Sequence, residues 1–195
     1  MELYYMRHGE TAWALVGQHT GKTDIPLTLH GETEARALRG ALAGVTFDRV
    51  FSSPRLRARH TAEIAGFADP IIEPDLAEWN YGDYEGLRLP EILALRPGWD
   101  IYTDGCPGGE SAAEITARAD RLIARWIHEP GRIGAFAHGH FGRVLAVRWI
   151  GLPLVAAKHF ALNTASYGVL DRDPTLDYRP RIVRWNLTPT VPASS

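Results

Sequence analysis

The chain has 195 residues, of which 45% are hydrophobic, and its formal net charge is −2. This length suits one domain with a substantial core, and the balanced charge argues against a nucleic-acid footprint. A single cysteine, Cys106, excludes an intramolecular disulfide. No apolar run is long enough to cross a bilayer or is typical of a secretion signal, so we expect a cytoplasmic globular protein.

The first motif follows a short apolar run. Residues 3–6 predict a buried β-strand, and Arg7, His8 and Gly9 come directly after it. In open α/β sheets, ligands bind at the carboxyl ends of the strands. A histidine at that edge can attack a phosphoryl group, while an arginine holds the anion and a glycine lets backbone N–H groups approach it. An ordinary polar strand end is the alternative.

The next segments predict one helix and a second strand. Residues 10–16 suit a short helical turn, and the loop 17–21 suits either a phosphate rim or any surface loop. A helix is expected over 31–42, followed by Gly44 as a stop, and a strand over 47–51.

An arginine-rich helix follows that strand. Ser53 is expected as its N-cap and Pro54 as its first residue. Cations in the first turn are disfavoured by the helix dipole, so a nearby anion explains these arginines better than helix stability does. A solvated basic helix start is the alternative. A buried alanine stripe separates Arg57 from Arg55 and Arg59, and only one flank is expected to face a site.

A segment over residues 76–86 mixes aromatic rings with carboxylates, among them Glu78 and Glu85. A carboxyl group surrounded by aromatic rings can act as a general acid near neutral pH. An aromatic surface with turn glycines explains the segment equally well. The elements expected around it are a strand at 71–72, a helix over 89–95 and a helix over 112–128 capped by Ser111.

The opening pattern recurs later in the chain. A strand over 133–137 ends in His138, and the helix expected over 141–150 carries Arg143. If the two strands are neighbours in one parallel sheet, His8 and His138 project from the same edge and can meet across one phosphate.

The remaining residues predict a terminal hairpin, with strands at 169–170 and 182–183. No linker divides the chain. Residues 1–187 are therefore expected to form one domain, and 188–195 an unstructured tail.

Several motifs together resemble the histidine phosphatase superfamily, which includes the cofactor-dependent phosphoglycerate mutases. In chain order they are Arg7-His8-Gly9-Glu10, Ser53-Pro54 with Arg57, Leu76-x-Glu78 and His138-Gly139. The amino-acid sequences of other segments, notably residues 78–86 and 136–140, are similar to those of the sedoheptulose-1,7-bisphosphatase branch. The resemblance implies a three-layer α/β/α sandwich with a mostly parallel central sheet, like that of phosphoglycerate mutase.

The resemblance also implies a role for each matching residue. His8 would be the nucleophile that forms a phosphohistidine, and Glu78 the proton donor to the leaving oxygen. The phosphate pocket would be completed by Arg7, Arg57 and His138. Further substrate contacts are expected from Thr20, Gly21, Glu85, Gly139, His140 and Arg143.

The leading hypothesis is a metal-independent phosphatase of small phosphorylated metabolites, such as sugar phosphates or bisphosphates. It needs no cofactor and no nucleic-acid or membrane partner, and a homo-oligomer stays open. Three alternatives are a phosphoglycerate mutase, a non-catalytic phosphate-binding regulatory module and a metal site. The short stretch 86–109 argues against a mutase, and the flanking arginines would repel a metal cation.

Overall fold

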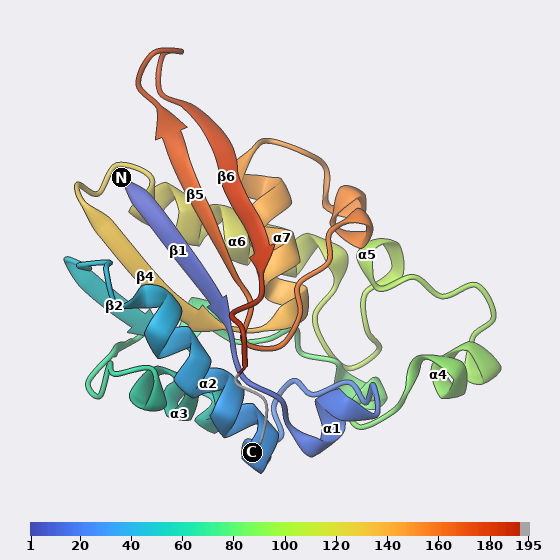
Figure 1. Cartoon of the computed structure of the whole chain (residues 1–195). Helices are drawn as coiled ribbons and strands as arrows, with labels where there is room; N and C mark the ends of the chain where they lie inside the picture. The colour runs from blue at the N-terminus through green and yellow to red at the C-terminus, as the bar shows by residue number, and fades with distance from the viewer. Residues whose placement is uncertain (192–195) are drawn as a thin grey trace.

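The computed structural model describes residues 1–191, and a six-stranded sheet forms its centre (Figure 1). The strands are β1 (Glu2–Arg7), β2 (Arg49–Ser52), β3 (Ile71–Ile72), β4 (Arg132–Ala137), β5 (Tyr167–Asp173) and β6 (Arg179–Leu187). They lie in the order β3-β2-β4-β1-β5-β6. Strands β3, β2, β4 and β1 are parallel, whereas β5 is antiparallel to both β1 and β6. This mixed, mostly parallel sheet confirms the predicted α/β fold class.

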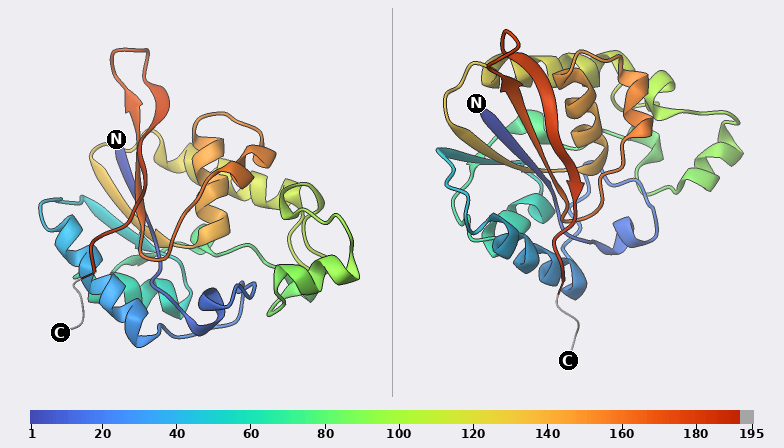
Figure 2. Two further views of the ribbon diagram at one scale, coloured as in Figure 1. Left: turned by 45° about the vertical axis from the view of Figure 1, so that its right-hand side comes forward. Right: turned by 45° about the horizontal axis from the view of Figure 1, so that its top comes forward.

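Helices cover both faces of the sheet, as Figures 1 and 2 show. On one face lie α2 (Leu29–Leu42) and α3 (Leu56–Ile64), and on the other α6 (Ala112–Trp126) and α7 (Gly139–Trp149). The shorter helices are α1 (Ala12–Leu15), α4 (Leu89–Leu95), α5 (Ile101–Asp104) and the 3₁₀ helices η1 (Pro74–Leu76), η2 (Gly82–Tyr84) and η3 (Leu154–His159). The sequence pattern did not predict α5 or the 3₁₀ helices, because a single turn is too short to show a helical period.

The two faces of β1 divide the core. Leu3 and Tyr5 are fully buried in the cluster that includes α6 and α7 residues, whereas Met6 is buried in the cluster on the α2 and α3 side. Side chains alternate across a strand, so one short apolar run can serve both layers. Each such side chain stabilises the fold by about 1.5–3 kcal/mol through burial.

The pairing of β1 with β4 brings the two histidine motifs together. The strands are parallel, and Arg7 lies opposite Ala137 in their register. The backbone N–H of His8 donates to the Ala137 carbonyl at 3.0 Å. Tyr5 joins the strand ends from within the core, because its hydroxyl donates to the His138 carbonyl at 2.9 Å and accepts from the His138 N–H at 3.1 Å. The predicted neighbouring strands are therefore confirmed.

The arginine-rich helix α3 begins later than predicted. Leu56 is its first residue, Arg55 occupies the N-cap position, and the Leu56 N–H donates to Asp24 Oδ1 at 2.9 Å. Ser53 is not the N-cap, and its hydroxyl lies 2.7 Å from His138 Nε2 and accepts from the Arg55 N–H at 3.3 Å. The expected N-cap is therefore wrong. The Asp24 carboxylate, which is distant in sequence, accepts the hydrogen bond from the first N–H of the helix instead.

The end of the described chain runs beside α2. Residues 188–191 have no regular secondary structure, and Pro189 and Thr190 line a groove with α2 residues. The rest of the predicted tail, 192–195, lies outside the described residues. Trp126 and Trp149 are buried in the core. Within residues 1–191, no helix combines the length and the apolar character that crossing a membrane requires.

Two glycine substitutions should have opposite effects on stability. A Cβ at Gly142 would lie 2.4 Å from Tyr5 Cε1, so Gly142→Ala should lower the free energy of unfolding by about 1–3 kcal/mol through overpacking. A Cβ at Gly40 in α2 meets nothing within 4 Å, so Gly40→Ala should raise it by about 0.5–1 kcal/mol. Urea unfolding measures both values, and the same sign for the two variants would contradict this packing.

Candidate active site

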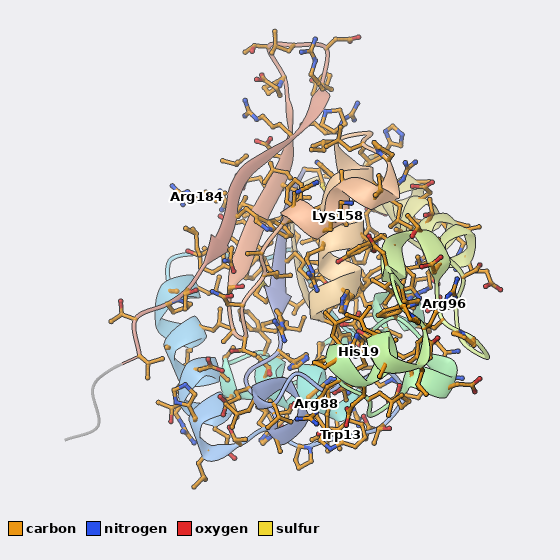
Figure 3. All side chains as sticks on the ribbon, turned by 90° about the vertical axis from the view of Figure 1, so that its right-hand side faces the viewer. Trp13, His19, Arg88, Arg96, Lys158 and Arg184 are labelled. Atoms are coloured by element: carbon orange, nitrogen blue, oxygen red, sulfur yellow. The ribbon has the colours of Figure 1, made fainter. Side chains whose placement is uncertain are left out.

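A cavity of about 470 Å³ opens where β1 and β4 end. Its chemical end is lined by Arg7, His8 and Glu78. The remaining lining residues are Ala14, Gly17, Gln18, His19, Thr20, Tyr81, Leu89, Trp99, Asp100, Ile101, Tyr102, Gly139, His140 and Arg143. Figure 3 faces this side of the molecule and labels His19. A cavity of this size is ordinary for a small-molecule site.

His8 is held as a neutral imidazole with one fixed hydrogen bond. Its Nδ1 lies 2.7 Å from the Gly9 carbonyl oxygen, which can only accept, so Nδ1 carries the proton. Burial lowers the pKa of His8 well below its ordinary value, and the charges of Arg57 and Arg7 lower it further. Nε2 therefore keeps a free lone pair, as a nucleophile requires.

His138 lies beside His8, with the two ring centroids 5.3 Å apart. Burial lowers its pKa well below the ordinary value, followed by the charge of Arg57. Its Nε2 contacts the Ser53 hydroxyl at 2.7 Å, and its buried Nδ1 has no hydrogen-bond partner among residues 1–191. A Ser53 hydroxyl that donates to Nε2 leaves the proton on Nδ1, which is then a donor without an acceptor.

Two buried guanidinium groups accompany the histidines. Arg7 Nη1 donates to the Leu162 carbonyl at 2.6 Å, and Arg57 donates to the Thr23 and Thr20 carbonyls at 3.0 and 2.8 Å. The buried Nε atoms of both arginines have no partner within residues 1–191. Burial lowers the pKa of both groups below the usual value for arginine. A buried donor left unpaired costs about 1–3 kcal/mol, so this cluster favours a bound anion.

The two flanks of α3 differ in burial. Arg57 is fully buried, whereas Arg59 is exposed. Arg55 is intermediate, although its Nε is also buried without a partner among the described residues. The Arg57 flank is therefore the one that faces the histidines.

Glu78 is tied to the first turn of α7. Its Oε1 accepts from the N–H groups of Trp79 at 2.9 Å and Phe141 at 2.8 Å, and its Oε2 accepts from the His140 N–H at 3.0 Å. The amino end of a helix attracts a carboxylate through its free N–H groups and dipole. These bonds hold the carboxyl group at the same cavity as His8.

The structure separates the other predicted contacts into two groups. Thr20, Gly139, His140 and Arg143 line the cavity. Gly21 and Glu85 are not among the lining residues. The Glu85 carboxylate instead accepts from the N–H groups of Gly21 and Thr23, at 2.9 and 3.0 Å, and so secures the loop whose carbonyls hold Arg57.

Gly9 is packed against α2 at the edge of the site. Its N–H donates to the Thr61 hydroxyl at 3.0 Å, so this N–H is not free for a phosphate. A Cβ at Gly9 would lie 2.4 Å from the Gly31 carbonyl oxygen. A glycine is therefore required here by the close approach of α2.

Sequence reasoning did not single out His19, which lines the cavity beside the predicted His140. His19 Nδ1 contacts the Leu87 carbonyl at 2.8 Å, and His140 Nδ1 contacts the Tyr81 hydroxyl at 2.7 Å. Burial lowers the pKa of both histidines. The only signal for His19 was its position in the glycine-bounded loop 17–21, which any surface loop shares.

Two features bear on other chemistry. Burial raises the pKa of the Cys106 thiol to about 12, which makes it a poor nucleophile. Among the described residues, no group of three or more His, Cys, Asp or Glu side chains is arranged to hold a metal ion.

The α/β sandwich and the paired histidines at its edge define a histidine phosphatase. A family model for the histidine phosphatase superfamily (branch 1) matches residues 3–188, so the chain belongs to that family and is a phosphatase.

Three comparisons show its relatives. The chain is 43% identical over 171 residues to an acid phosphatase of Mycobacterium tuberculosis, covering 86% of this chain and 84% of that one. It is 37% identical over 182 residues to the sedoheptulose 1,7-bisphosphatase of Saccharomyces cerevisiae, covering 75% and 66%. The solved structure of open reading frame Rv3214 from M. tuberculosis superposes with a TM-score of 0.90 at 38% identity, covering 96% and 97%. We expected the chain to be most similar to the sedoheptulose-1,7-bisphosphatase branch, but its identity to the acid phosphatase is higher than its identity to the bisphosphatase.

The buried histidines should make folding stability sensitive to acid. Their pKa values are lowered in the folded state, so the unfolded chain takes up protons first as the pH falls through about 6.5. The free energy of unfolding should then drop by up to about 1.4 kcal/mol per pH unit for each such imidazole. Urea unfolding between pH 7 and about 5.5 measures this slope.

A pair of histidine variants tests the assignment. His138→Gln should reduce the slope by up to about 1.4 kcal/mol per pH unit, because one buried imidazole and the proton that it takes up on unfolding are removed. His128 is exposed, so His128→Gln should leave the slope unchanged. A wild-type slope in His138→Gln would contradict the argument.

Proposed function

We propose that the chain hydrolyses small phosphorylated metabolites, among them sugar phosphates or bisphosphates such as sedoheptulose 1,7-bisphosphate, through a phosphohistidine on His8. The observation that carries this proposal is the cluster of unpaired buried donors around a neutral histidine. Arg7 Nε and Arg57 Nε are such donors, and His138 Nδ1 is a third when the Ser53 hydroxyl donates to His138 Nε2. They suit the oxygens of a phosphoryl group, and His8 Nε2 is the adjacent nucleophile.

In the first step, His8 Nε2 attacks phosphorus and the bond from phosphorus to the leaving oxygen breaks. Glu78 gives a proton to that oxygen and becomes the carboxylate that the Trp79, His140 and Phe141 N–H groups stabilise. Arg7, Arg57 and His138 stabilise the charge on the other three oxygens of the phosphoryl group. The Gly9 carbonyl accepts from Nδ1–H throughout and stabilises the positive charge that the ring acquires.

In the second step, water attacks the phosphohistidine. Glu78 accepts a proton from the water, the bond from phosphorus to Nε2 breaks, and inorganic phosphate leaves. His8 and Glu78 return to their starting forms, so the cycle balances. No step uses a metal ion.

The outer cavity supports a polar, small leaving group. Trp99 and Tyr102 supply aromatic walls against which a sugar can pack. Arg143 Nε donates to the Gly139 carbonyl at 3.2 Å, and within residues 1–191 its terminal nitrogens make no hydrogen bond. A second phosphate of a bisphosphate can bind there. The likeness to a sedoheptulose 1,7-bisphosphatase supports the same substrate class.

Phosphate release from a substrate panel tests this function. In the presence of a chelator, wild type should release phosphate from sedoheptulose or fructose bisphosphate, and His8→Ala should lose at least about 10³-fold of kcat because the nucleophile is gone. Glu78→Gln should lose about 10²–10⁴-fold on the same substrates, because it cannot supply the proton.

The panel also holds the outcomes that would change the proposal. Release only from phosphoglycerates or a phosphotyrosine peptide would overturn the substrate class. Interconversion of phosphoglycerates without phosphate release would indicate a mutase. Binding of sugar phosphates with no acid-labile phosphoenzyme would indicate a regulatory module.

A further inference from the structure

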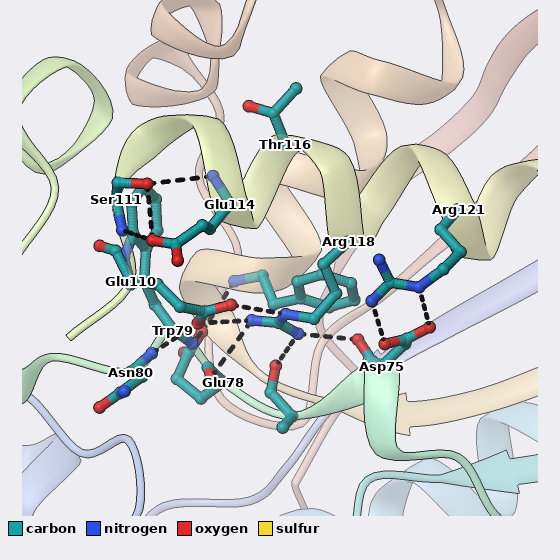
Figure 4. Close-up of polar contacts among 12 residues, drawn as sticks. Asp75, Glu78, Trp79, Asn80, Glu110, Ser111, Glu114, Thr116, Arg118 and Arg121 are labelled. Carbon is teal, nitrogen blue, oxygen red and sulfur yellow. Dashed lines mark hydrogen bonds and ion pairs between the residues drawn. The ribbon is translucent and has the colours of Figure 1, made fainter.

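Arg118 on α6 has every guanidinium N–H engaged by groups around Glu78 (Figure 4). Its Nη1 donates to the Asp75 and Ala77 carbonyls at 2.8 and 2.7 Å. Its Nε and Nη2 donate to the two carboxylate oxygens of Glu110 at 2.8 and 2.9 Å, and Nη2 also approaches the Glu78 carbonyl at 3.5 Å. The guanidinium therefore fixes the backbone immediately before and at Glu78.

Glu110 fixes the residues that follow Glu78. Its Oε2 accepts from the Asn80 N–H at 2.8 Å, and its backbone N–H donates to the Asn80 carbonyl at 2.8 Å. Its backbone carbonyl accepts from Trp79 Nε1 at 3.0 Å. The Arg118–Glu110 pair thus holds the loop on both sides of Glu78.

The same guanidinium also contacts the helix that receives the Glu78 carboxyl group. Arg118 Cζ lies 4.4 Å from the centre of the Phe141 ring, and the Phe141 N–H donates to Glu78 Oε1 at 2.8 Å. One side chain therefore sets the loop that carries Glu78 relative to the first turn of α7. Residues 77–81 have no regular secondary structure that would hold this loop in place by itself.

A neighbouring ion pair gives the contrast. Arg121 lies one turn further along α6, and its guanidinium pairs with the Asp75 carboxylate at 2.7 Å. Asp75 lies three residues before Glu78, so this ion pair also reaches the segment that carries Glu78. Arg121 is however largely exposed, and within residues 1–191 it makes no hydrogen bond to the backbone around Glu78. The two arginines differ in what they hold.

We propose that Arg118, paired with Glu110, is a positioning residue that aims the Glu78 carboxyl group at the leaving oxygen. This inference depends on the proposed role of Glu78 as proton donor. A purely structural role would also follow from these contacts, because breaking a buried ion pair is destabilising. A positioning role has a distinct signature, because only substrates whose leaving group needs a proton depend on it.

The test compares two substrates in Arg118→Lys, which keeps the charge but removes the planar fork of donors. On an alkyl phosphate such as a sugar phosphate, kcat/KM should fall about tenfold to a hundredfold, because a small misplacement of the acid is costly. On 2,4-dinitrophenyl phosphate, whose leaving group departs as a stable anion, kcat/KM should change less than about threefold. Arg121→Lys is the matched control and should change neither value.

A structural role predicts another result. Equal losses on both substrates, or no loss on either, would overturn the inference. If Arg118→Lys does not fold, Glu110→Gln carries the same comparison, since it weakens the pair from its other side. Urea unfolding of each variant establishes that the folded protein is the species assayed.

Glu78→Gln in the same assay separates this inference from the proposed function. If Glu78→Gln shows no dependence on the leaving group, the proposed proton donor is wrong. If Glu78→Gln shows that dependence and Arg118→Lys does not, the proton donor stands and the positioning role is overturned.

Discussion

Buried positive charge at the carboxyl ends of β1 and β4 is the constraint around which this molecule is organised. Arg7 and Arg57 are withdrawn from solvent beside two imidazoles that burial keeps neutral. Backbone carbonyls from three separate loop positions, Leu162, Thr20 and Thr23, take part of the guanidinium hydrogen bonds. The unpaired donors that remain are a cost that the apolar core on both sheet faces offsets.

That constraint explains why several polar groups outside the cavity form hydrogen bonds that hold the site residues in place. Glu85 secures the loop that presents carbonyls to Arg57, while Ser53 contacts His138 instead of starting a helix. Glu110 and Arg118 do the corresponding work for Glu78. Glu78 and the loop around Arg57 are therefore held by charged groups that do not line the cavity.

The sequence alone predicted most of the fold, because apolar periodicity and turn residues are local signals. The recurrence of strand, histidine and glycine predicted that β1 and β4 are neighbours, which their parallel register confirms. Contacts between distant residues were beyond such signals. Asp24 capping α3, and the close approach of Gly31 to Gly9, depend on chain segments that meet only in the folded molecule.

Some residues of the candidate site were predictable from local sequence signals, and others were not. His8, His138 and Arg57 follow recognisable strand ends or a helix start, so their proximity was predictable from topology. Glu85 and Gly21 were expected at the substrate, but they hold the loop behind Arg57. His19 and the stretch 99–102 reach the cavity from loops and a single helical turn, and no period in the sequence indicates which side chains face inward.

The two hydrogen bonds between Tyr5 and His138 tie the chemical end of the cavity to the middle of the sheet. We expect amide groups there to open only with the whole domain, whereas the outer part of the cavity is lined by residues of the short helices α1, α4 and α5. That part can loosen, or change in sequence, while the reaction centre stays intact. The fold thus places the paired histidines on the sheet and the outer part of the cavity on short elements, so the outer part can change without rebuilding the strand ends.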